Sequence, residues 1–266
     1  MKEYRDYYFL KAKQENYPAR SIYKLKEMDK AFRLFKPGMK VLDLGAAPGS
    51  WTLYAAERVG ERGRVIGADL QSTETTFPPN VTFLQENVFE RTPEFEALLE
   101  ETGPFDLVIS DMAPRTTGTK FTDQARSLEL CLEAMYVADR YLKPGGTFIA
   151  KIFMGPDFQD LVKPLRARYT TVKTFKPKSS RAESKEIFEV AMASRVPFRN
   201  KQLFRLEDIW PDIANGQTSD SARALRTPSA ARPSPRPPRK SSSLPRLAVI
   251  RPAMPVCVPP SLPLRP

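Results

Sequence analysis

The chain has 266 residues, of which 41% are hydrophobic, and it carries 42 Lys or Arg residues against 31 Asp or Glu residues. This length can bury a full core, and it predicts one domain of about 200 residues with an appended segment. Because the chain contains no histidine, histidine-based triads, proton relays and metal sites are excluded. Lys, Asp, Glu, Tyr and Ser remain for catalysis.

The two cysteines, Cys131 and Cys257, are too few for a disulfide framework and are typical of a reducing compartment. The first residues lack the hydrophobic core of a signal peptide. No apolar run approaches the roughly 20 residues of a membrane span. We therefore expect a cytoplasmic protein with no membrane partner.

Residues 217–266 differ in composition from the rest of the chain. They hold 12 of the 26 prolines and nine Lys or Arg residues, but a single acidic residue, Asp220. Such a segment buries too little apolar surface to offset the entropy of ordering, which predicts a disordered tail. The tail also carries most of the formal net charge of +11, so the charge says little about the folded domain.

Between these ends the sequence alternates between apolar strand patterns and amphipathic helix patterns. A helical pattern over residues 4–34 ends at Phe35-Lys36-Pro37-Gly38. Strands are predicted near 40–44, 64–69, 81–85, 105–110, 146–153, 171–175 and 187–193, and helices near 50–59, 93–101, 123–141 and 157–168.

This alternation predicts an α/β fold with a largely parallel sheet covered on both faces and ligands at the C-terminal strand ends. The loop from Lys176 to Lys185 is too short for a crossover helix, so the last two strands should form an antiparallel hairpin. A seven-stranded sheet of this kind, with an antiparallel last strand, is typical of a Rossmann-like methyltransferase. We divide the chain into an N-terminal helical segment (1–38), a methyltransferase domain (39–196), a C-terminal extension (197–216) and the tail (217–266).

The segment Val41 to Trp51 has the form of a buried strand that enters a glycine-rich turn and then a helix. Asp69, 20 residues after Gly49, ends the next strand, where a carboxylate can hold the two hydroxyls of a ribose. The turn has the spacing G-x-x-x-G and lacks the G-x-G-x-x-G of a pyrophosphate site. Asp43 just before it suits a cationic ligand. S-adenosylmethionine, with its ammonium and sulfonium groups, fits both features, and we expect Gly45 and Gly49 to open the backbone to it.

Three polar side chains are predicted to converge at the C-terminal edge of the sheet. Lys151 interrupts an apolar strand, and Asp111 follows another. Glu186 precedes the antiparallel strand, whose start lies at the same edge. Burial and a second cation favour a neutral lysine that can accept a proton, whereas a neighbouring carboxylate favours the ammonium. The residues alone leave open which effect is larger.

These segments together resemble the FtsJ/RrmJ family of S-adenosylmethionine-dependent RNA 2′-O-ribose methyltransferases, which includes bacterial enzymes that modify uridine in large-subunit ribosomal RNA. The resemblance extends from about Tyr17 to Ala193. It is carried by four stretches, Asp43 to Trp51, Ser110 to Pro114, Leu142 to Gly146, and Ser179 to Ala182 with Glu186.

The resemblance implies a catalytic tetrad of Lys24, Asp111, Lys151 and Glu186. It implies cofactor contacts at Gly49, Trp51, Asp69, Asn87 and Asp111, to which the turn itself adds Asp43. Asn87 stands where the family usually has Asp; its amide oxygen can still accept from the adenine amine, so we expect altered affinity and retained binding. Ser50 replaces the usual second glycine of Pro-Gly-Gly-Trp.

The implied reaction is attack of a ribose 2′-oxygen on the sulfonium methyl, with Lys151 as base or cationic stabiliser and Asp111 orienting it. Lys24 and Glu186 would hold the ribose. The reaction requires no metal. The implied partner is structured RNA, in particular large-subunit ribosomal RNA in the assembled particle, and a monomer is expected.

A basic rim is predicted around the ribose pocket, with aromatic side chains of the N-terminal segment divided between base stacking and packing. Its members would be Lys11, Lys13, Tyr17, Arg20, Lys176, Lys178 and Arg181, and the aromatics are Tyr4, Tyr7, Tyr8 and Phe9. Three alternatives stay open: a transfer RNA anticodon-loop 2′-O-methyltransferase, a non-catalytic ribosome-assembly factor, and a small-molecule O-methyltransferase with a lidded apolar pocket.

Overall fold

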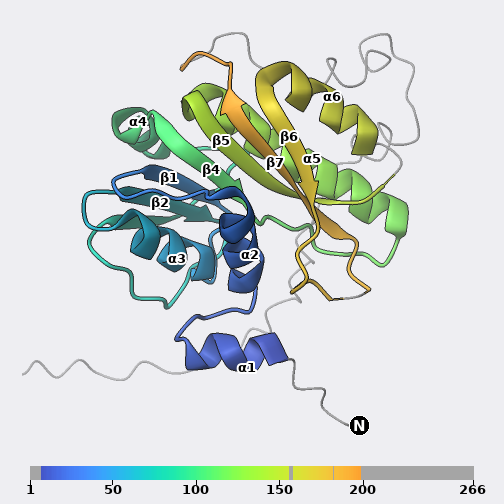
Figure 1. Cartoon of the computed structure of the whole chain (residues 1–266), viewed down its shortest axis with the longest axis horizontal. Helices are drawn as coiled ribbons and strands as arrows, with labels where there is room; N and C mark the ends of the chain where they lie inside the picture. The colour runs from blue at the N-terminus through green and yellow to red at the C-terminus, as the bar shows by residue number, and fades with distance from the viewer. Residues whose placement is uncertain (1–6, 156–157, 182, 199–266) are drawn as a thin grey trace, which may run out of the picture. The chain divides into compact units, whose positions relative to one another are not determined.

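A computed structural model describes residues 7–155, 158–181 and 183–198 of the chain. Helices lie on both faces of one mixed sheet (Figure 1). The helices are α1 (Tyr7–Gln14), α2 (Ile22–Phe32), α3 (Ser50–Val59), α4 (Pro93–Thr102), α5 (Lys120–Tyr141) and α6 (Phe158–Arg168). The strands are β1 (Lys40–Leu44), β2 (Arg64–Asp69), β3 (Val81–Gln85), β4 (Phe105–Ser110), β5 (Leu142–Phe153), β6 (Tyr169–Phe175) and β7 (Glu186–Ser194).

The strand order is β3-β2-β1-β4-β5-β7-β6. The pairs from β3 to β5 are parallel, whereas β7 runs antiparallel to both β5 and β6. The predicted Rossmann-like sheet and its antiparallel hairpin are therefore confirmed. Because β7 runs in the opposite direction, its first residue lies at the edge where β4 and β5 end.

The core has two layers because side chains alternate across each strand. On β1, Val41 packs against α2 and α3, whereas Leu42 and Leu44 pack against α4 and α5 on the other face. The same alternation holds on β5, where Ile149 faces α2 and α3. A polar side chain two residues from one of these apolar anchors therefore lies on the same face as the anchor.

The helical segment predicted over residues 4–34 is interrupted in the structure, because α1 and α2 are separate helices. Asn16 has a φ of 60°, a left-handed conformation that asparagine tolerates better than most residues and that ends a helix. Pro18 then follows, and its ring disfavours helical geometry at the residue before it. Tyr4 lies outside the described residues, as do the tail and Cys257.

Strand β5 begins at Leu142, four residues earlier than expected. Its pairing with β4 is irregular there, since Phe105 pairs with Leu142 while Leu107 pairs with Thr147. Lys143 to Gly146 form this irregular stretch, in which Gly145 has a φ of 79°.

In the described part of the chain, none of the helices has the length and apolar character needed to cross a membrane.

Candidate active site

Four charged side chains meet at the edge of the sheet where β4 and β5 end. Lys151 Nζ lies 2.9 Å from Asp111 Oδ1 and 3.8 Å from Glu186 Oε1. Lys24 Nζ lies 2.8 Å from Glu186 Oε2 and 4.0 Å from Asp111 Oδ1. Each cation thus contacts both carboxylates, and the four residues predicted as a tetrad form one closed ionic cluster.

The sheet geometry explains why Lys151 and Glu186 approach each other. Lys151 lies two residues after Ile149 on β5, so its side chain is on the face covered by α2. Glu186, the first residue of β7, pairs with Phe153 across the antiparallel ladder. Lys24 extends from α2 above this pair and completes the cluster from a segment more than 160 residues away in sequence.

Lys151 is the most deeply buried of the four, at 5% exposed. Its Nζ donates to the backbone oxygen of Asp111 at 2.6 Å in addition to contacting the carboxylate. Glu186 Oε1 lies 3.8 Å away, beyond hydrogen-bond distance, so Nζ can still donate to a further partner. Asp111 therefore fixes where Lys151 points, as expected of an orienting residue.

The cations of the cluster keep Glu186 ionised. Burial opposes ionisation, but the charges of Lys24 and Lys151 and hydrogen bonds from Lys24 and Ser184 outweigh it and lower the pKa of Glu186 below its ordinary value. The ionised Glu186 therefore presents a negative charge to both lysines of the cluster.

An open pocket of about 310 Å³ adjoins the cluster. Its lining is polar or charged throughout and consists of Arg20, Ser21, Lys24, Arg181, Glu183, Ser184 and Glu186. Such a lining suits a hydroxyl-bearing, anionic substrate better than an apolar one. The lidded apolar pocket expected of a small-molecule O-methyltransferase is not seen beside the cluster in the described residues.

Glu27 positions the loop that carries Arg181, a role that the sequence analysis missed. Its carboxylate accepts hydrogen bonds from the backbone N–H groups of Lys178 and Ser179, at 2.6 and 2.8 Å. Arg20 donates to the Ser179 backbone oxygen at 2.5 Å from the same side. The only signal available in the sequence was the position of Glu27 one helical turn after Lys24, which is common in solvated helices.

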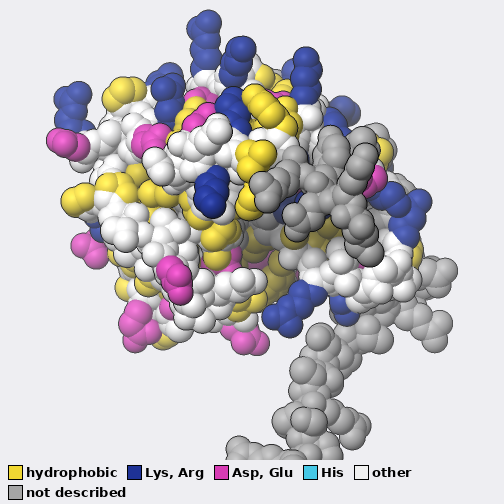
Figure 2. All heavy atoms as spheres, turned by 90° about the horizontal axis from the view of Figure 1, so that it is seen from below, with side chains coloured by type: hydrophobic (Ala, Val, Ile, Leu, Met, Phe, Trp, Pro, Cys, Tyr) yellow, Lys and Arg dark blue, Asp and Glu magenta, His cyan; other side chains and the backbone are white. Residues whose placement is uncertain are grey.

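The predicted basic rim is only partly formed. Arg20 and Arg181 line the pocket beside the cluster, but Tyr17 is 9% exposed and its hydroxyl donates to Glu57 at 2.8 Å. Tyr17 therefore packs inside the molecule because its hydroxyl has a partner there. On the face seen from below, many Lys and Arg side chains gather along the upper edge, where some acidic side chains also lie, and several Asp and Glu side chains lie at the lower left (Figure 2).

The N-terminal aromatics divide between packing and exposure, as expected. Tyr8 packs against Tyr23, with ring centroids 5.2 Å apart. Tyr7 and Phe9 are 67% and 53% exposed on α1. Lys11, on the same helix, lies over the Tyr23 ring at 5.0 Å. Two of these aromatic side chains are thus available for contact with a partner.

Two glycines of the turn after β1 leave room for neighbouring protein side chains, because a Cβ added at either glycine would clash with them. A Cβ on Gly45 would lie 2.6 Å from Met112 Cγ and 3.0 Å from its Cα, and one on Gly49 would lie 2.9 Å from the Phe77 ring. The Cβ positions of both glycines thus face protein side chains, and the expectation that these glycines open the backbone to a ligand stays a prediction. The hydroxyls of Thr73 and Thr75 both donate to the Pro48 oxygen, which ties the segment after β2 to this turn.

We expect Gly45→Ala to destabilise the fold more than Gly145→Ala does. Both glycines have a φ of 79°, so both substitutions carry the same backbone strain of about 1–2 kcal/mol. Only Gly45 adds a clash, because nothing lies within 4 Å of a Cβ on Gly145. Urea unfolding should show a larger loss of unfolding free energy for Gly45→Ala by about 1–3 kcal/mol. Equal losses would show that Met112 moves aside freely.

Asp43 is fully buried on the face of β1 covered by α3. Its Oδ2 accepts from Thr52 Oγ1 at 2.6 Å, and its Oδ1 has no hydrogen-bond partner. Burial, together with the charges of Asp111 and Asp69, raises the pKa of Asp43 to about 7, against the opposing hydrogen bond from Thr52. An unsatisfied, buried carboxylate oxygen of this kind is suited to a cation.

The remaining predicted cofactor residues lie at the ends of neighbouring strands. Asp69 accepts from the backbone N–H groups of Ala47 and Gln71, at 3.0 and 2.8 Å, so it ties the glycine-rich turn to the end of β2. Asn87 Oδ1 accepts from the Phe89 N–H at 3.0 Å, and this leaves the oxygen its second lone pair.

The Trp51 indole is 3% exposed and packs on Phe188 at a ring-centroid distance of 5.7 Å. Its Nε1–H donates to the Ser21 oxygen at 2.9 Å. The side chain therefore supports the fold between α2 and β7.

Among the described residues, no group of three or more His, Cys, Asp or Glu side chains is arranged to hold a metal ion.

Comparison with known proteins identifies the family. A model of the FtsJ-like methyltransferase family matches residues 17–194. The ribosomal RNA large subunit methyltransferase E of Nitratidesulfovibrio vulgaris (strain DP4) is 72% identical over 195 residues, which are 73% of this chain and 96% of the relative. The protein of the same name from Lawsonia intracellularis is 59% identical over 192 residues, covering 72% of this chain and 96% of the relative.

A solved structure agrees with these relatives. The crystal structure of a ribosomal RNA methyltransferase from Plasmodium falciparum has a TM-score of 0.60 and 30% sequence identity, and the match covers 67% of this chain and 98% of that one. The family model covers more than half of the chain and includes all four residues of the ionic cluster. The chain therefore belongs to the FtsJ-like methyltransferase family.

Proposed function

We propose that the protein transfers a methyl group from S-adenosylmethionine to the 2′-oxygen of a uridine ribose in large-subunit ribosomal RNA, acting on the assembled subunit. One observation carries the proposal. The side chains of Lys24, Asp111, Lys151 and Glu186 form a closed ionic cluster beside a polar pocket at the C-terminal edge of the sheet. The relatives named as ribosomal RNA large subunit methyltransferase E support the substrate class.

The residues around the turn fit the cofactor. Oδ1 of Asp43 is buried and has no hydrogen-bond partner among the described residues, so it can receive a positively charged group of the cofactor. Asp69 ends β2, where a ribose can be held. Asn87, near the end of β3, would meet the adenine. When bound, S-adenosylmethionine would supply a sulfonium methyl group that a ribose oxygen can attack in line, so that the O–C bond forms, the C–S bond breaks and the neutral thioether leaves.

The ionic cluster supplies the rest of the chemistry. Asp111 contacts Lys151 at two atoms, which directs Lys151 Nζ toward the ribose 2′-oxygen. As the neutral amine Lys151 would accept the hydroxyl proton, and as the ammonium it would stabilise the developing alkoxide. Lys24 and Glu186 border both the cluster and the pocket, so they hold the ribose in line. Alignment of this kind can contribute several kcal/mol to the lowering of the barrier.

Labelled-methyl transfer tests the proposal. Wild-type protein is incubated with labelled S-adenosylmethionine and three acceptors: unmodified large ribosomal subunits, protein-free large-subunit RNA and bulk transfer RNA. We expect label on the subunits, located by nucleoside analysis as 2′-O-methyluridine. Label mainly on protein-free RNA would remove the assembled-subunit preference, and label mainly on transfer RNA would assign an anticodon-loop enzyme. No label on any acceptor would indicate a non-catalytic assembly factor.

A further inference from the structure

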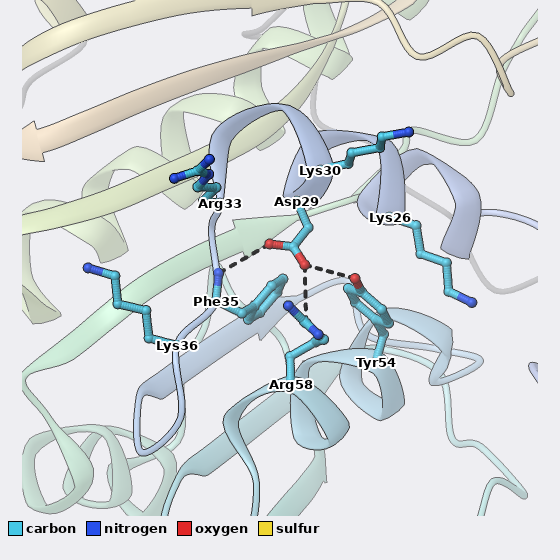
Figure 3. Close-up of a pocket in the computed structure, with 8 residues that line it drawn as sticks. All are labelled: Lys26, Asp29, Lys30, Arg33, Phe35, Lys36, Tyr54 and Arg58. Carbon is cyan, nitrogen blue, oxygen red and sulfur yellow. Dashed lines mark hydrogen bonds and ion pairs between the residues drawn. The ribbon is translucent and has the colours of Figure 1, made fainter.

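A second charged pocket lies beside α2 and α3. It is open, has a volume of about 540 Å³ and is lined by Lys26, Asp29, Lys30, Arg33, Phe35, Lys36, Tyr54 and Arg58 (Figure 3). We call it the basic pocket, because five of these eight residues are cations. None of them belongs to the ionic cluster or to the predicted cofactor site.

The basic pocket and the ionic cluster use different sides of the same helix. Lys26, Lys30 and Arg33 follow one another at intervals of four and three residues, so they lie along one side of α2 and its end. Lys24 is only two residues before Lys26, which places it about 200° around the helix. A ligand in the basic pocket would therefore be separate from the reacting ribose.

Among the described residues, Asp29 is the single carboxylate that lines the basic pocket, and both of its oxygens already have partners. Oδ1 accepts from the backbone N–H groups of Leu34 and Phe35 at 2.9 and 3.3 Å. Oδ2 accepts from the Tyr54 hydroxyl at 2.8 Å and lies 3.2 Å from Arg58 Nε. Asp29 is 6% exposed, so it holds the walls of the pocket together, and its carboxylate is not directed at Lys30, Arg33 or Lys36.

The cations that remain suit a phosphate. Arg58 is anchored through Nε, and in the described residues neither of its terminal nitrogens has a hydrogen bond, so one edge of a half-exposed guanidinium stays open. A guanidinium held in this way can bind a phosphate through two parallel bonds. Lys30, Arg33 and Lys36 are exposed and have no ion pair within the same part of the chain.

Lys26 differs from the other four cations. It forms a 2.5 Å ion pair with Glu15 and lies over the Tyr17 ring at 4.5 Å. In the close-up Lys26 and Lys30 extend to one side of the pocket, whereas Arg33 and Lys36 extend to the opposite side (Figure 3). Lys26 therefore serves the packing of α1 and α2, and the charge available to a ligand comes from Lys30, Arg33, Lys36 and Arg58.

We propose that the basic pocket binds the phosphate backbone of the RNA substrate at a point remote from the ribose that is methylated. This inference rests on the proposed function. Several cations spread across an open pocket match a polyanion whose charges are regularly spaced, and each phosphate contact releases condensed counterions. An anchor on the far side of α2 fixes the orientation of a structured RNA while another part of it enters the pocket beside Lys24.

The test compares two double variants of the full chain. Lys30→Gln with Lys36→Gln removes two exposed cations of the basic pocket. Arg58 is retained because it forms an ion pair with the buried carboxylate of Asp29. The matched control, Arg166→Gln with Lys173→Gln, removes two exposed cations from α6 and β6. Dissociation constants for protein-free large-subunit RNA are measured over a series of salt concentrations, and KM for the subunit acceptor is measured in the methyl-transfer assay.

The pocket variant should bind RNA about 5- to 20-fold more weakly than wild type, with a KM raised in proportion. The slope of log affinity against log salt should become shallower by about 2, because roughly one unit is lost for each phosphate contact. The control variant should match wild type in RNA affinity and in salt slope. Wild type and both double variants contain the same basic tail, so its contribution to RNA binding cancels in the comparison.

Failure of this inference can be distinguished from failure of the proposed function. If wild type methylates RNA while the pocket variant keeps its affinity and salt slope, the basic pocket does not bind the backbone and only this inference is overturned. An equal loss in both double variants would also overturn it, because the effect would then reflect total charge. If wild type neither binds nor methylates RNA, the proposed function fails as well.

Discussion

Replacing Lys151 with alanine should abolish methyl transfer, with a loss on the order of 10³-fold in kcat. Lys151 Nζ lies 2.9 Å from the Asp111 carboxylate and also donates to the Asp111 backbone oxygen, whereas Lys24 Nζ lies 4.0 Å from that carboxylate, so Lys24 is not placed to substitute for it. Binding of S-adenosylmethionine, measured by calorimetry, should stay within about threefold of wild type, because Asp43 and Asp69 are unchanged. Single-turnover transfer to large subunits measures the chemical step directly.

Two further variants separate chemistry from structure. Lys151→Met keeps the length and apolar stem of the side chain, so it tests the loss of the amine without a large cavity. Lys173→Ala removes an exposed cation from β6 and should retain wild-type activity. Activity of Lys151→Met within tenfold of wild type would exclude Lys151 as the base or the cationic stabiliser. A loss confined to KM would place Lys151 in substrate binding alone.

Replacing Asp43 with asparagine should stabilise the protein without ligand and weaken cofactor binding. The pKa of Asp43 is about 7 in the folded protein, above its ordinary value of 3.8. The folded state therefore keeps a proton that the unfolded chain loses, and stability falls as pH rises from about 4 to about 7. Asparagine has no proton to lose, so its advantage should grow over this range and reach up to about 4 kcal/mol at pH 8.

The cofactor should show the opposite trend in wild type. A cationic ligand favours the ionised carboxylate, so affinity for S-adenosylmethionine should fall as pH decreases below 7, by up to about tenfold per pH unit. Asp43→Asn should bind weakly at every pH. Urea unfolding without ligand and calorimetry at pH 6, 7 and 8 measure the two effects. Parallel pH dependence in the two proteins would show that Asp43 does not titrate in this range.

Asp123→Asn provides a control with the opposite sign. Hydrogen bonds from the Thr117 and Gly118 backbone lower the pKa of Asp123, so its contribution to stability is present above its ordinary pKa and lost in acid. Asp123→Asn should therefore be less stable than wild type at pH 8, and the gap should narrow as pH falls. Opposite pH trends in the two variants would rule out a general effect of removing a negative charge.

Short-range sequence patterns were enough to predict most of the sheet and the position of Lys151. Strand alternation has a period of two, so a lysine two residues after Ile149 shares its face whatever else the chain does. The direction of β7 followed from the short loop before it, and that direction was enough to place Glu186 at the edge where Asp111 lies. These predictions depend on local stereochemistry, which the sequence determines.

The partners that come from distant segments depended on the tertiary structure. Glu27 holds a loop more than 150 residues away, and the neighbours of Gly45 and Gly49 come from the ends of other strands and loops. Asp29 and Arg58 build the basic pocket only because α2 packs on α3. The sequence by itself predicted the residues of the ionic cluster and determined which face each strand residue takes. The packing of helices on the sheet decided which of these residues meet, because side-chain contacts over long sequence separations depend on geometry that no local pattern encodes.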